Sequence, residues 1–249
     1  PLFKISRGDI VKAVSRVAFS AATDDIKPVL TGVLMEVKGE SISFVGTDGL
    51  RLSRQIINLD SSAEKDINIL VPVKALMELS HIVSEINEDE DVEVFLVEDR
   101  NQILFRYSDI DLVSRLIDGE FPEYRQIIPT GYKTICKKYL SLFLNSLKIT
   151  NIIARSVLGN KLILDIDPKV NKITLSATQT DLGSNKSTFE GKIDGDPLKI
   201  AFSSRLLSDI LNHIDSEEIL FECSETVKPG VFKIADEDDF VHLVMPMMI

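Results

Sequence analysis

The sequence predicts an α+β fold made of two similar domains. Apolar residues recur at helical spacing in a few segments and alternate as in β-strands in most of the others. The order of these segments then begins again after about 130 residues, which marks an internal repeat. Two helices backed by antiparallel strands, present twice in one chain, are the arrangement that these patterns indicate.

The first half contains two predicted helices. Residues 8–22 place apolar side chains on one face, and Asp9 lies near the start, where a carboxylate interacts favourably with the helix dipole. A second helix is expected at residues 72–85. Residues 38–40 and 47–49 carry turn signals between alternating stretches. The predicted strands are residues 33–37, 42–44, 52–56, 67–71, 92–97, 103–107 and 112–117.

The second half repeats this order, with helices predicted at residues 133–150 and 203–214. Equivalent positions carry similar residues, as in the pairs Ile42 with Ile173 and Lys74 with Arg205. The predicted strands are residues 161–167, 172–177, 199–202, 218–223, 231–235 and 240–245.

The boundary between the domains is expected at the linker residues Pro129, Thr130 and Gly131. The sequence therefore predicts domains at residues 1–129 and 130–249.

The composition is that of a globular protein in a reducing compartment. Of the 249 residues, 44% are hydrophobic and 27% charged, and the net charge is −11. The two cysteines, Cys136 and Cys223, lie too far apart for a disulfide framework or a zinc motif. No apolar run approaches the roughly 20 residues of a membrane helix. We therefore expect a cytoplasmic protein that does not bind membranes.

Basic residues collect on or beside the predicted helices, although the chain is acidic. Acidic residues gather instead in predicted loops, at 88–91, 98–99 and 236–239. A row of basic helices can contact a phosphate backbone by charge alone, without reading sequence. The alternative is an ordinary solvated helix surface. The candidate DNA-facing residues on this pattern are Lys12, Arg16, Lys74, Lys137, Lys138, Lys148 and Arg205.

No catalytic motif is evident. Residues 46–49 lack the lysine and the spacing of a phosphate-binding loop, and the three histidines lie apart without partners at metal-ligand spacing. Asp109 and Asp111 alternate on a predicted strand and leave a phosphodiester hydrolase as a third hypothesis. We therefore expect no catalytic residues, no metal and no cofactor.

Four stretches closely resemble one family. They are residues 27–34 (KPVLTGVL), 46–52 (GTDGLRL), 116–124 (LIDGEFPEY) and 244–247 (VMPM). In this order and spacing they are similar to the bacterial sliding clamp, the β subunit of DNA polymerase III, and the match runs the whole length of the chain. The chain resembles the second and third of the family's three repeats. The first repeat is expected to be absent, in agreement with a sequence that does not begin with methionine.

The resemblance implies a processivity factor that encircles duplex DNA, a non-catalytic subunit of the polymerase holoenzyme. The family forms a homodimeric ring of six repeats, and a chain of two repeats is not expected to close it. The implied partners are sequence-independent double-stranded DNA, the polymerase III catalytic subunit, the clamp loader and other replication and repair proteins. A scaffold of the same fold that binds peptides without encircling DNA remains the alternative.

Partners of the family dock a short peptide into a hydrophobic pocket, and the resemblance transfers that pocket to named positions. Residues 240–244 match a strand of the first repeat, whereas residues 245–249 are expected to form one wall of the pocket. The resemblance also implies that Lys27 and Lys74 face DNA, and Arg205 extends this set through the repeat. The implied pocket residues are Leu30, Thr47, Gly49, Leu50, Arg51, Leu52, Pro122, Ile127, Leu243, Val244, Met245, Pro246, Met247, Met248 and Ile249.

Some positions depart from the family pattern. Leu50 stands where histidine is frequent, Gln126 where some members have arginine, and Met248 and Ile249 where arginine and leucine are usual. The pocket rim is thus expected to be less basic. Residues 28–29 replace aromatic residues that some members place beside single-stranded DNA.

Overall fold

A computed structural model describes residues 1–86 and 90–249. The chain divides into two compact units, Pro1–Tyr124 and Arg125–Ile249, and each is described by itself. The predicted boundary after residue 129 lies five residues beyond this division. Part of the predicted acidic loop at 88–91 lies outside the described residues, and Asp91 begins a strand. Among the described helices, none is long and apolar enough to cross a membrane.

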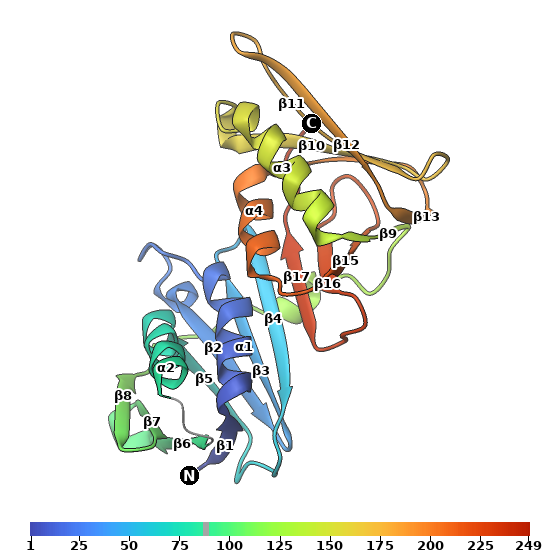
Figure 1. Cartoon of the computed structure of the whole chain (residues 1–249). Coiled ribbons are helices and arrows are strands. Elements are labelled where there is room, and N and C mark those ends of the chain that lie inside the picture. The colour runs from blue at the N-terminus through green and yellow to red at the C-terminus, as the bar shows by residue number, and fades with distance from the viewer. Residues whose placement is uncertain (87–89) are drawn as a thin grey trace. The chain divides into compact units, whose positions relative to one another are not determined.

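The two units contain their helices and strands in the same order, except that the second has one additional strand, Lys192–Gly195, between its helices (Figure 1). The first unit consists of β1 (Phe3–Ser6), α1 (Arg7–Val17), β2 (Gly32–Lys38), β3 (Ser41–Thr47), β4 (Arg51–Asn58), β5 (Ile67–Pro72), α2 (Val73–Glu85), β6 (Asp91–Val97), β7 (Gln102–Tyr107) and β8 (Ile110–Arg115). The second unit consists of β9 (Thr134–Tyr139), α3 (Leu140–Ala154), β10 (Lys161–Asp167), β11 (Lys172–Gln179), β12 (Gly183–Glu190), β13 (Lys192–Gly195), β14 (Leu198–Ser203), α4 (Ser204–His213), β15 (Glu218–Cys223), β16 (Gly230–Ile234) and β17 (Phe240–Val244).

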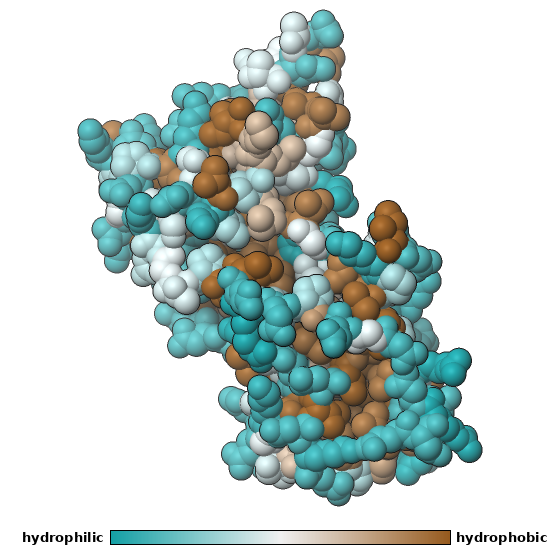
Figure 2. Space-filling view, turned by 180° about the vertical axis from the view of Figure 1, so that it is seen from behind, coloured by the Kyte–Doolittle hydropathy of each residue, from teal (hydrophilic) through white to brown (hydrophobic). Residues whose placement is uncertain are grey.

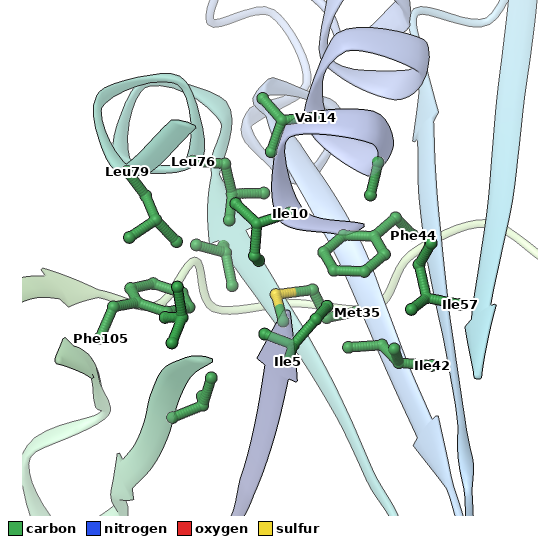
Figure 3. Close-up of a cluster of buried hydrophobic side chains, with 14 of the residues drawn as sticks. Ile5, Ile10, Val14, Met35, Ile42, Phe44, Ile57, Leu76, Leu79 and Phe105 are labelled. Atoms are coloured by element: carbon green, nitrogen blue, oxygen red, sulfur yellow. The ribbon is translucent and has the colours of Figure 1, made fainter. Parts of the chain in front are cut away.

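The first unit packs two helices against antiparallel strands. One sheet has the order β1-β6-β7-β8, and the strands β5, β2, β3 and β4 are neighbours in another. α1 lies against α2, and side chains from both helices meet those of the strands, among them Ile10, Met35, Phe44 and Phe105 (Figure 3). These four side chains are buried. Each such burial stabilises the fold by about 1.5–3 kcal/mol, so this core holds the helices in place.

Helix α1 begins at an N-cap and ends earlier than its apolar pattern predicts. The Asp9 N–H donates to Ser6 Oγ at 3.1 Å, and Ser6 Oγ donates to Asp9 Oδ2 at 2.7 Å, which satisfies the start of the helix. The prediction of a helix to residue 22 is wrong, because the α-helix stops at Val17 and a 3₁₀ turn covers Ala18–Ser20. Ala21 is nevertheless buried, so the turn keeps the apolar side inward.

The second unit has sheets of order β12-β11-β10-β14 and β13-β9-β15-β16-β17. The predicted helix at 133–150 is wrong in its first part, since Thr134–Tyr139 is the strand β9 between β13 and β15. Alternate residues of β9 are buried, which is the strand period. Helix α3 begins only at Leu140. Strands β12 and β13, which the sequence pattern did not indicate, complete the two sheets.

Candidate functional site

A rigid turn presents Leu50 on the first unit. Thr47 Oγ1 donates to the Arg51 carbonyl at 2.6 Å and accepts from the Gly49 N–H at 3.1 Å. Asp48 Oδ1 accepts from the N–H groups of Leu50 and Arg51, and Asp48 Oδ2 pairs with Arg51 Nε at 3.1 Å. Gly49 has φ +89°, a conformation that favours glycine. These contacts immobilise the turn and leave the Leu50 side chain 56% exposed.

The pocket residues expected on the first unit therefore fall into two classes. Leu30, Thr47, Arg51 and Leu52 are buried and support the surface from below. The exposed members are Gly49, Leu50 and Pro122.

The chain that follows β8 is docked by a backbone hydrogen bond and a close side-chain contact. The Ile117 N–H donates to the Leu70 carbonyl at 2.9 Å. A Cβ on Gly32 would lie 2.7 Å from Ile117 Cδ1, so only glycine lets the isoleucine lie there undisturbed. Further along, the buried Tyr124 phenol donates to the Glu36 carboxylate. The segment is thus fastened at both ends within its own unit.

The chain that follows β17 is docked on the second unit. The Met247 N–H donates to the Ala201 carbonyl at 2.8 Å, which forms an isolated β-bridge to β14. A Cβ on Gly159 would lie 2.6 Å from Met247 Cε, and Lys161 Nζ donates to the Met248 carbonyl at 3.4 Å. The last residues of this chain are therefore held beside the sheet that contains β10 and β14.

Apolar side chains reach the surface in this part of the second unit. Leu243 and Val244 are buried, as expected of residues in a strand, whereas Met245, Met248 and Ile249 are exposed by 40%, 90% and 61%. Pro246 and Met247 are half-buried, and Ile127 is 48% exposed. Figure 2 shows that hydrophobic residues (brown) also reach the surface among hydrophilic ones (teal) on the face drawn there. The segment after Val244 thus exposes large side chains that a folded chain normally buries.

Some predicted DNA-facing residues are on the surface. Lys27, Lys74, Lys148 and Arg205 are exposed, and Lys12 is half-buried. Lys74 and Arg205 are each the second residue of their helices, α2 and α4. The internal repeat therefore places a basic side chain at the same position in both units.

Two other predicted DNA-facing residues, Arg16 and Lys138, are buried, and Lys137 is half-buried. Arg16 is buried, and its Nη1 donates to Gln55 Oε1 at 3.0 Å. Lys137 lies on β9, where its ammonium pairs with Glu218 at 2.8 Å. Lys138 is only 2% exposed, with Nζ 3.9 Å from the centre of the Phe143 ring. Arg16 and Lys138 cannot meet a phosphate at the surface, because the strand or helix period turns them inward.

Burial changes the ionisation of Lys138. Loss of water around the ammonium lowers its pKa from 10.5 to about 8. Its Nζ has no hydrogen-bond partner among the described residues, and its neighbours include the rings of Phe143 and Phe221. Both cysteines are free thiols whose pKa is raised by burial.

Of the two carboxylates considered for hydrolysis, Asp111 forms an ion pair on its sheet. Asp111 on β8 accepts from Arg106 Nε at 2.7 Å and from Arg106 Nη2 at 2.9 Å, and this pairing lowers the pKa of Asp111. Asp109 lies in the turn before β8. Within the described ranges, no three histidine, cysteine or acidic side chains are grouped so that they could hold a metal ion. The arrangement of Asp109 and Asp111 gives the hydrolase hypothesis no support.

Sequence reasoning missed the residues that dock the final segment, above all Gly159 and Ala201. One signal was available. The repeat offset pairs Ile117 with Met247 and Leu70 with Ala201, so the contact in one unit predicts the contact in the other. Gly159, at φ +70°, carries no such signal, because its role depends on the side chain opposite it.

The fold is that of the sliding clamps. It matches the DNA polymerase III beta subunit of Thermotoga maritima with a TM-score of 0.92 and 25% identity, over 99% of this chain and 65% of that one. The sliding clamp of Bacillus subtilis matches with the same TM-score and identity, over 64% of its chain. A clamp from Pseudomonas aeruginosa described as bound to griselimycin matches at 0.92 and 24% identity, over 99% of this chain and 65% of that clamp.

The chain belongs to the family of DNA polymerase III beta subunits. Residues 4–123 match the family's central domain, and residues 125–248 match its C-terminal domain. The beta sliding clamp of Staphylococcus epidermidis is 28% identical over 98% of this chain, and that of Staphylococcus aureus is 27% identical over the same share. The chain spans 65% of the length of these curated relatives.

Proposed function

We propose that this chain acts as part of a sliding clamp that encircles duplex DNA and tethers the replicative polymerase, without catalysing a reaction itself. The observation that carries the DNA contact is the repeated basic residue at the start of α2 and α4. A helix N-terminus already has a positive partial charge, so Lys74 and Arg205 do not stabilise their own helices. The same position suits an anionic phosphate, which both the helix end and the side chain attract.

Salt dependence tests this contact. The double variant Lys74→Ala with Arg205→Ala should reduce the slope of log K against log salt by about two, because each lost phosphate contact removes roughly one counterion. Fluorescence anisotropy with a labelled DNA duplex, at several salt concentrations, gives the slope. Lys169→Ala, a lysine in the exposed turn after β10, is the control and should leave the slope unchanged. An unchanged slope in the double variant would exclude these two residues as phosphate contacts.

We also propose that partner proteins dock a short apolar peptide on this chain, in the full set of pocket positions given above. Support comes from the exposed Leu50 on its rigid turn in the first unit and the exposed Met248 in the second. Apolar anchors with a few fixed polar groups are typical of such sites. The proposed partners are the polymerase catalytic subunit, the clamp loader and repair proteins. Free Cys136 and Cys223 fit a location in the cytoplasm.

We propose griselimycin, to which the Pseudomonas aeruginosa relative is described as bound, as a ligand that occupies this site. Titration calorimetry should detect binding to the wild type and at least tenfold weaker binding to Leu50→Asp, which puts a charge on the turn. Ile152→Asp on α3 is the control, because Ile152 is exposed but lies outside the proposed set. Equal affinity of all three proteins would count against the site.

A peptide-binding scaffold that does not encircle DNA is the second candidate. It is favoured by α3, where Leu142, Ile149 and Ile152 are exposed and Lys148 is the single charged residue. The repeat pairs Lys12 of α1 with Leu142, so the first and third helices do not share a basic surface. Peptide binding without any salt-dependent DNA binding would select this candidate.

A further inference from the structure

The final segment, residues 245–249, is anchored through Met247. Strand β14 is an edge strand of its sheet, and the Ala201 carbonyl on that edge accepts the Met247 N–H at 2.8 Å. A single backbone hydrogen bond contributes about 0.5–1.5 kcal/mol, which is too little to hold a segment by itself. The side chain of Met247 must therefore contribute to the anchor.

Gly159 provides the place for that side chain. Its φ of +70° is the left-handed conformation, and Asn160 follows with φ +56°, so the chain turns sharply between α3 and β10. A Cβ on Gly159 would come within 2.6 Å of Met247 Cε and 3.8 Å of its sulfur. The glycine thus leaves room for the methionine methyl to lie directly on the backbone of the turn.

The first unit contains the same anchor. Ile117, which the repeat pairs with Met247, donates its N–H to the Leu70 carbonyl, and Leu70 pairs with Ala201. Ile117 also packs against a glycine, Gly32 at the start of β2. The hydrogen bond to the equivalent strand therefore occurs in both units. The glycine under each apolar side chain lies at a different position of the repeat, since the offset takes Gly32 to Leu162 and not to Gly159.

The anchor determines which side chains of the final segment are available. Met247 is half-buried, whereas Met248 is 90% exposed and Ile249 61% exposed. Lys161 Nζ reaches the Met248 carbonyl at 3.4 Å, a long contact that restrains the backbone without covering the side chain. The segment is thus held at Met247 by an isolated bridge and presents apolar side chains outward.

We propose that Gly159 and the Ala201 carbonyl are positioning groups, which fix Met247 as an anchor so that Met248 and Ile249 contact the apolar residues of a docked partner peptide. This assignment rests on the proposed peptide-docking function and deepens it. It separates the final segment into a residue that holds the site together and residues that determine which peptide binds.

Methionine methyl NMR tests the anchor directly. The chain has five methionines, of which Met35 is buried and Met77 is 56% exposed, so these two are internal standards for rigid and mobile methyl groups. In the wild type labelled with ¹³C-methyl methionine, the Met247 methyl should be nearly as ordered as Met35. In Gly159→Ala it should become as mobile as Met77. A mobile Met247 in the wild type would overturn the anchor.

Gly183→Ala is the matched control. Gly183 also has a positive φ, +104°, but a Cβ there would meet nothing within 4 Å. The two substitutions therefore impose the same kind of backbone strain, and only Gly159→Ala disturbs Met247. Met247→Ala is a second variant that leaves both glycines intact and removes the anchoring side chain itself.

Peptide binding is measured on the same proteins by anisotropy, with a short fluorescein-labelled peptide that carries leucine and phenylalanine anchors. Gly159→Ala, Met247→Ala and Met248→Ala should each weaken binding at least tenfold, whereas Gly183→Ala should not. If the wild type binds no peptide, the proposed docking function fails while the NMR still decides the anchor. If Gly159→Ala frees Met247 but binds the peptide like the wild type, the positioning role is wrong.

Discussion

The segments after β8 and after β17 begin alike and then differ. Each donates one N–H to the equivalent strand and lays an apolar side chain on a glycine. In the first unit the chain then continues to Tyr124, which is buried against Glu36. In the second unit the residues after the anchor expose their side chains. The same docking contact therefore supports a connection that ends at a buried tyrosine in one unit and a candidate binding surface in the other.

This comparison shows how a repeated fold can acquire a site without new architecture. The anchor residues, Ile117 and Met247, are the part that repeats. The residues after each anchor can differ between the units, because the fold of each unit is already complete at that point. The residues after Ile117 and Met247 are therefore where the two units are expected to differ in function.

Deletion of residues 245–249 should have the largest effect, and mainly on peptide binding. Affinity for the labelled peptide should fall more than about 100-fold, because the deletion removes the apolar side chains proposed to contact the peptide. The free energy of unfolding in urea should fall by only about 1 kcal/mol, and the transition should stay cooperative. Ile152→Ala, another exposed apolar position, should change neither quantity. Loss of cooperativity would mean that the segment is part of the core.

Gly32→Ala and Gly159→Ala compare how much each anchor contributes to the free energy of unfolding. Gly32→Ala should destabilise by about 2–3 kcal/mol, because its Cβ would meet Ile117 and also the Val71 carbonyl oxygen, 3.0 Å away in a β-strand. Gly159→Ala should cost only about 1 kcal/mol, since the end of the Met247 side chain can leave. Urea unfolding of both variants measures the difference, and equal costs would contradict it.

Lys138→Met sharpens the comparison of the two cores. The buried Arg16 of the first unit donates to Gln55, whereas the buried Lys138 of the second has no hydrogen-bond partner among the described residues. The pKa of Lys138 is about 8 when folded and near 10.5 when unfolded, so the unfolded chain binds more protons between these values. Wild-type stability should therefore rise from pH 8 to 10.5. Lys138→Met should stabilise the protein at pH 7, by on the order of 2 kcal/mol, and remove this pH dependence.

Urea unfolding at pH 7 and pH 10 measures both effects. Lys137→Met, which changes the neighbouring partly exposed lysine on β9, is the control and should not show the same gain at pH 7. A wild type whose stability is flat between pH 8 and 10 would contradict the lowered pKa of Lys138.

Tyr124→Phe should have a smaller effect than Gly32→Ala. The variant removes the phenol that donates to the buried Glu36 carboxylate, at a cost of about 1–2 kcal/mol. Tyr132→Phe, at a tyrosine that is 51% exposed, should cost nothing measurable. Urea denaturation distinguishes them, and equal midpoints would show that the connection in the first unit does not depend on this hydrogen bond.

The order of helices and strands followed largely from local pattern. Helix and strand periods identified most elements, and strands β10 and β15 have the predicted bounds. The pattern failed at Thr134–Tyr139, because a short stretch that contains two lysines has no clear alternation of apolar and polar residues. Its pairing with β13 and β15, which are distant in sequence, makes it a strand.

By itself the sequence determined the repeat and the family and indicated the positions proposed for the site, because these depend on residues in order along one chain. The tertiary structure alone decided which of those residues are accessible. Lys138 and Lys148 look alike in the sequence, yet one ammonium lies over an aromatic ring and the other is in water. Exposure depends on what packs against a side chain, and in a sheet that neighbour comes from elsewhere in the sequence. The same is true of Gly159, whose importance is visible only once Met247 lies against it.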